Sequence, residues 1–175
     1  NLGFRGGTIK EISINSDKFR RIILCEGESE EALKLKSLGY EVIDKFVGGE
    51  VGKGIFYDIR HNPGASSMKK PCSKFTELYG DKVYYLEHLK YQEIAVEVTD
   101  LPTEMKQLSI NQVDLLKLDI QGFEYEVLSS FLTTSIRPLV IHCEVEQVPL
   151  YLEQSYGCEI DTLLLLSLIH ISEPT

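Results

Sequence analysis

The sequence predicts an α/β fold, with a mostly parallel sheet and helices on both of its faces. Short apolar runs alternate along the chain with segments of helical periodicity. The connections between the first runs are long enough to hold a helix, as parallel strands require. At 175 residues, with 43% hydrophobic and 26% charged residues, the chain has the length and composition of one globular domain.

The clearest strand and helix pattern lies in residues 113–132, VDLLKLDIQGFEYEVLSSFL. An apolar run that ends at Asp119 is typical of a buried parallel strand. Gln121 and Gly122 turn the chain, and the apolar residues that follow recur at helical spacing. Open α/β sheets bind ligands outside the carboxyl ends of their strands. Asp119 is therefore a candidate binding residue.

The segments on either side are expected to supply the neighbouring strands and helices. Ser29 is a candidate N-cap and Gly39 a candidate end for the first helix, and Asp100 is a candidate cap for a later one. The expected strands cover residues 21–25, 41–47, 55–59, 94–98, 113–119 and 139–143. The expected helices cover residues 29–39, 73–79, 101–108 and 123–132, with a last one that begins at residue 158.

Glu26 follows the first of these strands and is a second candidate binding residue. Folds that bind dinucleotides place an acid about 20 residues after a glycine turn, where it accepts hydrogen bonds from ribose hydroxyls. Gly3 lies at about that distance before Glu26. A carboxylate suits a vicinal diol because it accepts two hydrogen bonds. A solvated acid at the end of a strand is the alternative interpretation.

His142 and Glu144 lie near the carboxyl end of the last expected strand. They alternate with Cys143, so they are expected to share one face of the strand. Either side chain could act as a general base. A role for His142 in the core is the alternative, and Lys117 and Asp119 are further candidates for the base.

The central stretch also carries a family resemblance. Residues 117–122, KLDIQG, are preceded by VDLL and followed by Glu124 and Leu128. This pattern resembles the central signature of the FkbM-type methyltransferases, and the resemblance extends over most of residues 1–165. It implies a Rossmann-like methyltransferase sheet and an enzyme that uses S-adenosylmethionine (SAM) to methylate a hydroxyl group of a sugar, polyketide or other metabolite.

The resemblance also implies roles for particular residues. Glu144 and His142 are the expected catalytic residues, and no metal is expected. The expected cofactor-binding residues are Asn1, Gly3, Glu26, Asp119 and Gln121. Two other interpretations remain open at this point: an NAD- or nucleotide-sugar-binding enzyme on a similar sheet, and a non-catalytic Rossmann-like binding module.

Both ends of the sequence indicate a fragment. In the family, an Asn-x-Gly turn follows the first strand, so residues 1–3 are expected to begin inside that turn. Residues 166–175 match an in-frame translation of a transposase-type sequencing adapter and are expected to be a non-native tail. We therefore expect a partial domain over residues 1–165 that lacks its first strand and its C-terminal strands. Such a fragment is expected to be inactive, unlike its parent.

Charge and cysteine usage narrow the possible partners. A net charge of −9 argues against a nucleic-acid partner, because such surfaces are basic. The four cysteines show no C-x-x-C spacing, which favours a reduced, cytoplasmic protein. No apolar stretch is long enough to span a bilayer. The expected partner is a small-molecule or glycan acceptor.

Overall fold

The computed structural model describes residues 19–73 and 90–168. Its helices are α2 (Ser29–Ser37), α5 (Leu101–Gln107), α6 (Glu124–Phe131), α7 (Gly157–Leu168) and the short 3₁₀ helix η2 (Pro63–Ala65). Its strands are β1 (Ile23–Cys25), β2 (Glu41–Ile43), β3 (Phe46–Gly48), β4 (Gly52–Asp58), β5 (Gln92–Asp100), β6 (Leu115–Leu118) and β7 (Val140–Cys143). The expectations for Asn1, Gly3 and most of the helix at residues 73–79 fall outside the described residues.

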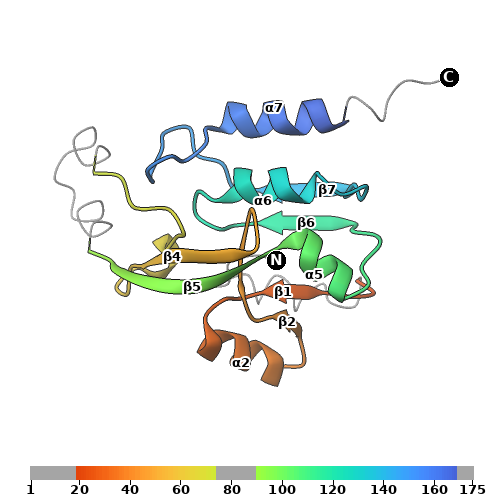
Figure 1. Cartoon of the computed structure of the whole chain (residues 1–175), viewed down its shortest axis with the longest axis horizontal. Coiled ribbons are helices and arrows are strands. Elements are labelled where there is room, and N and C mark those ends of the chain that lie inside the picture. Colours follow the sequence, from red (N-terminus) through yellow and green to blue (C-terminus); the bar gives the residue numbers. More distant parts are fainter. Residues whose placement is uncertain (1–18, 74–89, 169–175) are drawn as a thin grey trace.

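Two parallel strand pairs confirm the mixed α/β class. β1 pairs with β2, and β6 pairs with β7, each in parallel register. β1 and β6 run in the same direction, so their carboxyl ends lie at the same end of the molecule (Figure 1). Residues that follow these two strands are thereby directed to one end of the fold.

Side-chain alternation in β1 divides its contacts between two apolar clusters. Leu24 packs with Leu35 of α2 on one face of the β1–β2 pair. Cys25 belongs to the main core, which also contains Leu118 of β6 and Phe131 of α6. α7 adds Ile160 to this core and packs on α6 (Figure 1). The main core therefore joins both strand pairs, and α2 covers the opposite face of β1–β2.

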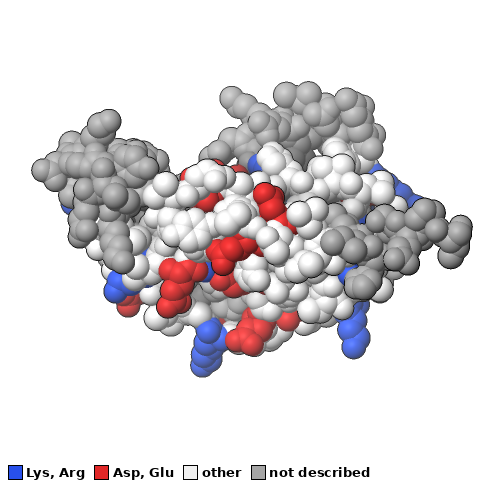
Figure 2. Space-filling model, turned by 90° about the horizontal axis from the view of Figure 1, so that it is seen from above, with Lys and Arg blue, Asp and Glu red and all other residues white. Residues whose placement is uncertain are grey.

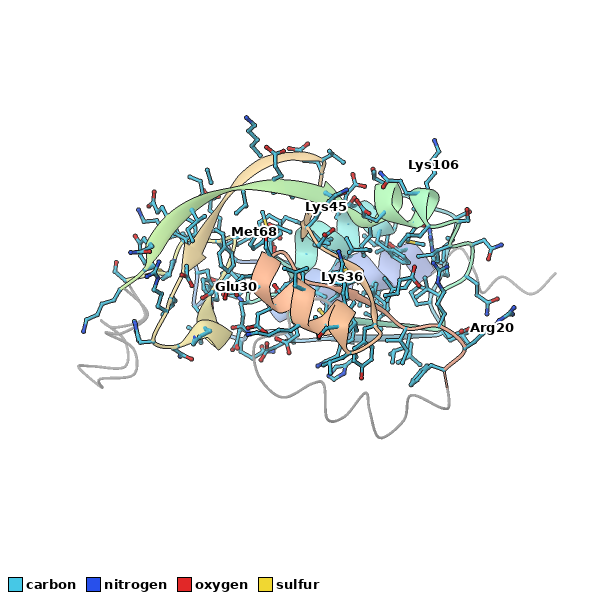
Figure 3. All side chains as sticks on the ribbon, turned by 90° about the horizontal axis from the view of Figure 1, so that it is seen from below. Arg20, Glu30, Lys36, Lys45, Met68 and Lys106 are labelled. Carbon is cyan, nitrogen blue, oxygen red and sulfur yellow. The ribbon has the colours of Figure 1, made fainter. Side chains whose placement is uncertain are left out.

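The expected single strand at residues 41–47 is wrong. Residues 41–43 form β2, whereas residues 46–48 form β3, which pairs with β5. Asp44 and Lys45 lie between the two segments and are exposed. Their ion pairs lead to different helices: Asp44 Oδ2 is 2.7 Å from Nζ of Lys36 in α2, and Lys45 Nζ is 2.8 Å from Oε1 of Glu104 in α5. Figure 3 labels the two lysines. Two polar residues thus divide one apolar pattern between two sheets.

The second sheet has the order β3-β5-β4, with β4 antiparallel to β5. The edge strand expected at residues 55–59 is therefore present, as part of β4. Met68, in the connection that follows β4, lies against the sheet (Figure 3). A Cβ added at Gly54 would lie 2.9 Å from Met68 Cε, so this glycine permits the close approach. The contact anchors the segment that reaches the candidate site.

The helix ends test the expected caps. Asp100 caps α5, because its Oδ1 accepts a hydrogen bond of 2.7 Å from the N–H of Thr103. The expected cap at Ser29 is wrong: α2 begins at Ser29, and its N-cap is Glu28, which makes no side-chain capping bond. Glu30 and Glu31 supply negative charge in the first turn, which interacts favourably with the helix dipole.

Candidate functional site

The turn between β6 and α6 is the centre of the candidate site. Gln121 and Gly122 both have positive φ angles, 54° and 91°. A Cβ added at Gly122 would lie 2.9 Å from the ring of Tyr151. Glycine is therefore required there both for the backbone conformation and for the space. Two consecutive residues in this conformation turn the chain after Ile120, one residue beyond Asp119.

Asp119 and Glu144 come together because β6 and β7 are parallel and in register. Leu118 pairs with Cys143, so each acid follows directly after a paired residue. The N–H of Glu144 continues the ladder with a 3.2 Å bond to the carbonyl of Leu118. The amide nitrogen Nε2 of Gln121 then bridges the two acids, at 3.2 Å from Asp119 Oδ1 and 2.9 Å from Glu144 Oε2.

The surroundings of Glu144 raise the pKa of its carboxyl group. Partial burial raises the pKa of Glu144, and the charge and hydrogen bond of Asp119 raise it further. The Gln121 amide acts in the opposite direction and lowers that pKa. Lys117 Nζ lies 3.7 Å from Asp119 Oδ2. Two close carboxyls hold a proton more readily than one carboxyl alone, as a general base requires.

A third acid, Glu124, lies beneath the turn and is almost completely buried. Its Oε1 accepts a hydrogen bond of 2.9 Å from the N–H of Ile120. Burial raises the pKa of Glu124 to about 7, against the opposing effect of its backbone hydrogen bonds. The sequence indicated only that an acid in the first helical turn suits the helix dipole. Its burial depends on the packing of the turn against the core.

Two segments distant in sequence hold Gln121 in place. Ser67, from the connection after β4, donates a 2.6 Å hydrogen bond to the main-chain carbonyl of Gln121. The hydroxyl of Tyr151, from the segment after β7, has one proton, which it directs at two acceptors: the carbonyl of Ala65 at 2.7 Å and Gln121 Oε1 at 3.3 Å. Ser67 and Tyr151 are both almost fully buried. In the sequence, Tyr151 ends a Pro-Leu-Tyr segment and Ser67 belongs to a loop pair, Ser66-Ser67, but neither pattern predicts a contact with Gln121.

The other expected site residues lie at the ends or on the outer faces of strands. Glu26 follows β1 and is buried, and its Oε1 accepts a 2.9 Å hydrogen bond from the N–H of Glu28. A Cβ added at the next residue, Gly27, would lie 2.4 Å from the ring of Phe46. His142 is exposed on β7, in register with Lys117 of β6. The structure therefore brings Asp119, Gln121 and Glu144 into one hydrogen-bonded cluster and places Glu26 at the turn after β1.

The described part of the chain holds neither a cluster of potential metal ligands nor a helix suited to span a membrane. Residues 19–73 and 90–168 contain no group of three or more His, Cys, Asp or Glu side chains that could hold a metal ion. All four cysteines are free thiols, and burial raises the pKa of Cys25 to about 11. Within the same residues, none of the helices combines the length and the apolar character needed to cross a bilayer.

Comparison with known proteins gives one match. The sequence matches the model of the Methyltransferase FkbM domain over residues 15–168, which is most of the chain. Neither the curated proteins nor the solved structures contain a match. The match includes β6, the turn at Gln121 and Gly122, and β7. The chain therefore belongs to the FkbM methyltransferase family.

Proposed function

We propose that this chain belongs to a SAM-dependent O-methyltransferase whose acceptor is a hydroxyl group of a sugar, polyketide or other metabolite. The observation that carries the proposal is the cluster of Asp119, Gln121 and Glu144 at the carboxyl ends of two parallel strands. This is the edge at which open α/β sheets bind their ligands. Membership of a methyltransferase family supplies the reaction class.

We also infer that β2-β1 and β6-β7 are parts of one Rossmann-like sheet. Cys25 and Ile43 share an apolar cluster with Leu116 and Leu118. β1 and β6 run in the same direction (Figure 1), and helices pack against the strand pairs. In this arrangement the acids that follow β1 and β6 face the same end of the sheet, where one ligand could contact both.

The acids at this edge fit the polar groups of SAM. A carboxylate accepts several hydrogen bonds at once, so the bond from Glu28 to Glu26 is compatible with bonds from a ribose diol. Asp119 is partly exposed, and its carboxylate suits the ammonium group of the methionine part. Asn1 and Gly3 remain predicted contacts to the same ligand. SAM, when bound, supplies a methyl group on a positively charged sulfur.

Glu144 is the proposed general base, with His142 as the second candidate. Partial burial of the carboxyl group and the neighbouring Asp119 raise its pKa, so it holds a proton more strongly than an ordinary glutamate. A base with a pKa nearer to neutrality removes an alcohol proton more effectively, and such a group contributes about 10²–10⁴-fold to rate. Glu144 is exposed, so an acceptor could reach it from solvent.

Surface charge supports a small-molecule or glycan acceptor over a nucleic acid. On the face seen from above, acidic side chains lie over the centre and basic ones lie mostly toward the rim (Figure 2). This distribution would repel a phosphodiester backbone. We further propose a cytoplasmic location, and the four free cysteines support it.

The test uses the full reading frame of the gene that encodes this chain. SAM binding is measured by calorimetry for the wild type and for Glu26→Gln, Asp119→Asn and Glu144→Gln, with the exposed Glu97→Gln as control. Methyl transfer from labelled SAM is measured on a panel of glycoside and polyketide alcohols. We expect the first two variants to lose SAM affinity. Glu144→Gln should retain affinity and lose turnover.

Other outcomes would contradict the proposal. Thermal stabilisation by NAD or a nucleotide sugar, without stabilisation by SAM, would indicate a different Rossmann-like enzyme. Stabilisation by none of these ligands would favour a non-catalytic module. Equal SAM affinity in the wild type and in Asp119→Asn would remove Asp119 from the site.

A further inference from the structure

Gln121 lies where three separate segments of the chain meet. Its carbonyl oxygen accepts from Ser67, its side-chain oxygen faces the hydroxyl of Tyr151, and its side-chain nitrogen reaches Asp119 and Glu144. Its φ angle of 54° is one that non-glycine residues rarely adopt. A strained residue with contacts on every polar atom of its side chain is held in place by its surroundings.

The orientation of the Gln121 amide determines whether Asp119 and Glu144 face a hydrogen-bond donor or an acceptor. The NH₂ group has two hydrogens, and the bonds to Asp119 and Glu144 use both. If the amide were reversed, its carbonyl oxygen would face the two carboxyl groups, and the contact would be repulsive. The two carboxyl groups therefore oppose the reversal, and Tyr151 adds to this, because its one hydroxyl proton is shared between the carbonyl of Ala65 and the side-chain oxygen of Gln121. The ring is 1% exposed, and its bond to the carbonyl of Ala65 fixes the hydroxyl in place.

We propose that Gln121 is a positioning residue, whose amide is oriented by Tyr151 and holds Asp119 and Glu144 together as one carboxyl pair. Glu144 is the member of the pair that takes up a proton, and the Gln121 amide stabilises its ionised form. The inference rests on the proposed function only in naming Glu144 as the base. It also separates Gln121 from the cofactor ligands, since both of its amide hydrogens are used within the protein.

The role of the Gln121 amide can be measured through the pKa of Glu144. Partial burial, Asp119 and Glu146 raise the pKa of Glu144, and the Gln121 amide is the hydrogen-bond donor that lowers it. Glu124 of α6 interacts with Glu144 through its charge, and Lys117 of β6 lies beside Asp119. Removal of the amide therefore leaves Glu144 among acids without this donor. Its proton should then be lost at a higher pH.

The test follows the carboxyl carbon of Glu144 by ¹³C NMR as a function of pH, with the signal assigned from Glu144→Gln. Gln121→Met removes both donors at similar size and should raise the titration midpoint by about one pH unit. Tyr151→Phe keeps the donors but frees the amide to reverse, so it should raise the midpoint by a smaller amount. The matched control is Gln112→Met, because Gln112 donates to Asp114, two residues away on an exposed surface.

Four outcomes decide between the possibilities. An unchanged midpoint in Gln121→Met would overturn the proposal. An unchanged midpoint in Tyr151→Phe, which retains the shape of the buried ring, would show that Tyr151 does not orient the amide. SAM affinity provides a separate readout: Gln121→Met should retain affinity that Asp119→Asn loses, and an equal loss would make Gln121 a cofactor ligand. If the wild type bound no SAM, the proposed function would fail while the titration result would stand.

Discussion

Glu124 gives the most direct test of the electrostatics around the site. It is 3% exposed, at the start of α6, and its pKa is raised from 4.5 to about 7 by burial. Each pKa unit corresponds to about 1.4 kcal/mol, so the ionised form costs the folded state about 3 kcal/mol relative to an ordinary glutamate. Substitution by glutamine keeps an oxygen that can accept the hydrogen bond from Ile120 and removes the titration.

The direction in which stability changes with pH follows from the raised pKa of Glu124. Between pH 4.5 and pH 7, folded Glu124 holds a proton that the unfolded chain has lost. The free energy of unfolding should therefore fall by about 2–3 kcal/mol between pH 5 and pH 8 through Glu124 alone. The raised pKa of Glu144 adds a change in the same direction. Glu124→Gln should remove the first contribution and leave the second.

The assay is urea unfolding followed by circular dichroism at several pH values, with linear extrapolation to water. The matched control is Glu30→Gln, because Glu30 also lies in the first turn of a helix, α2, but is exposed. The control should follow the pH dependence of the wild type. If the profile of Glu124→Gln ran parallel to that of the wild type, burial of an ionisable group at this position would not control stability.

Three further substitutions test the packing that supports the site. Gly122→Ala places a Cβ 2.9 Å from Tyr151 at a residue with positive φ and should lower the free energy of unfolding by about 2–4 kcal/mol. The control is Gly52→Ala, whose added Cβ would have no atom within 4 Å, and it should change the free energy of unfolding by less than about 0.5 kcal/mol. Equal effects in urea unfolding would remove the steric argument. Lys45→Met leaves the carboxylate of Glu104, which is 7% exposed, without its cation and should lower the free energy of unfolding by about 2 kcal/mol. Lys36→Met breaks an exposed ion pair and should lower it by less than about 1 kcal/mol. An equal loss in the two variants would contradict this prediction. Phe131→Ala empties a site that is 0% exposed and should cost about 3–5 kcal/mol, and a loss below about 1 kcal/mol in the same assay would place this ring outside the core.

Local sequence patterns were sufficient for the regular elements near the site. The apolar run at residues 113–119 contains β6, and the change to helical spacing after Gly122 marks α6. Asp100 was recognised as a cap because an N-cap bond joins residues three apart in the chain. These features depend on interactions between close neighbours, so the sequence alone reveals them.

Local patterns did not predict that residues 41–48 are divided between two sheets. Residues 41–47 look like one strand, because Val42, Ile43, Phe46 and Val47 are all apolar. Their division between two sheets depends on which strands lie beside them, and β5 is about 50 residues further along the chain. The antiparallel pairing of β4 with β5 has the same origin. Pairing over such distances is decided by the packing of the whole fold.

The sequence by itself determined the family, the α/β class and the positions of Glu26, Asp119 and Glu144 at strand ends. Only the tertiary structure decided how Asp119 and Glu144 meet, because their approach depends on the register of β6 with β7. It also decided the burial of Glu124 and the contacts of Gln121 with Ser67 and Tyr151, which lie 54 and 30 residues away in sequence. A side chain's residue type fixes the chemistry it can perform, but its pKa and its partners depend on neighbours that folding brings close.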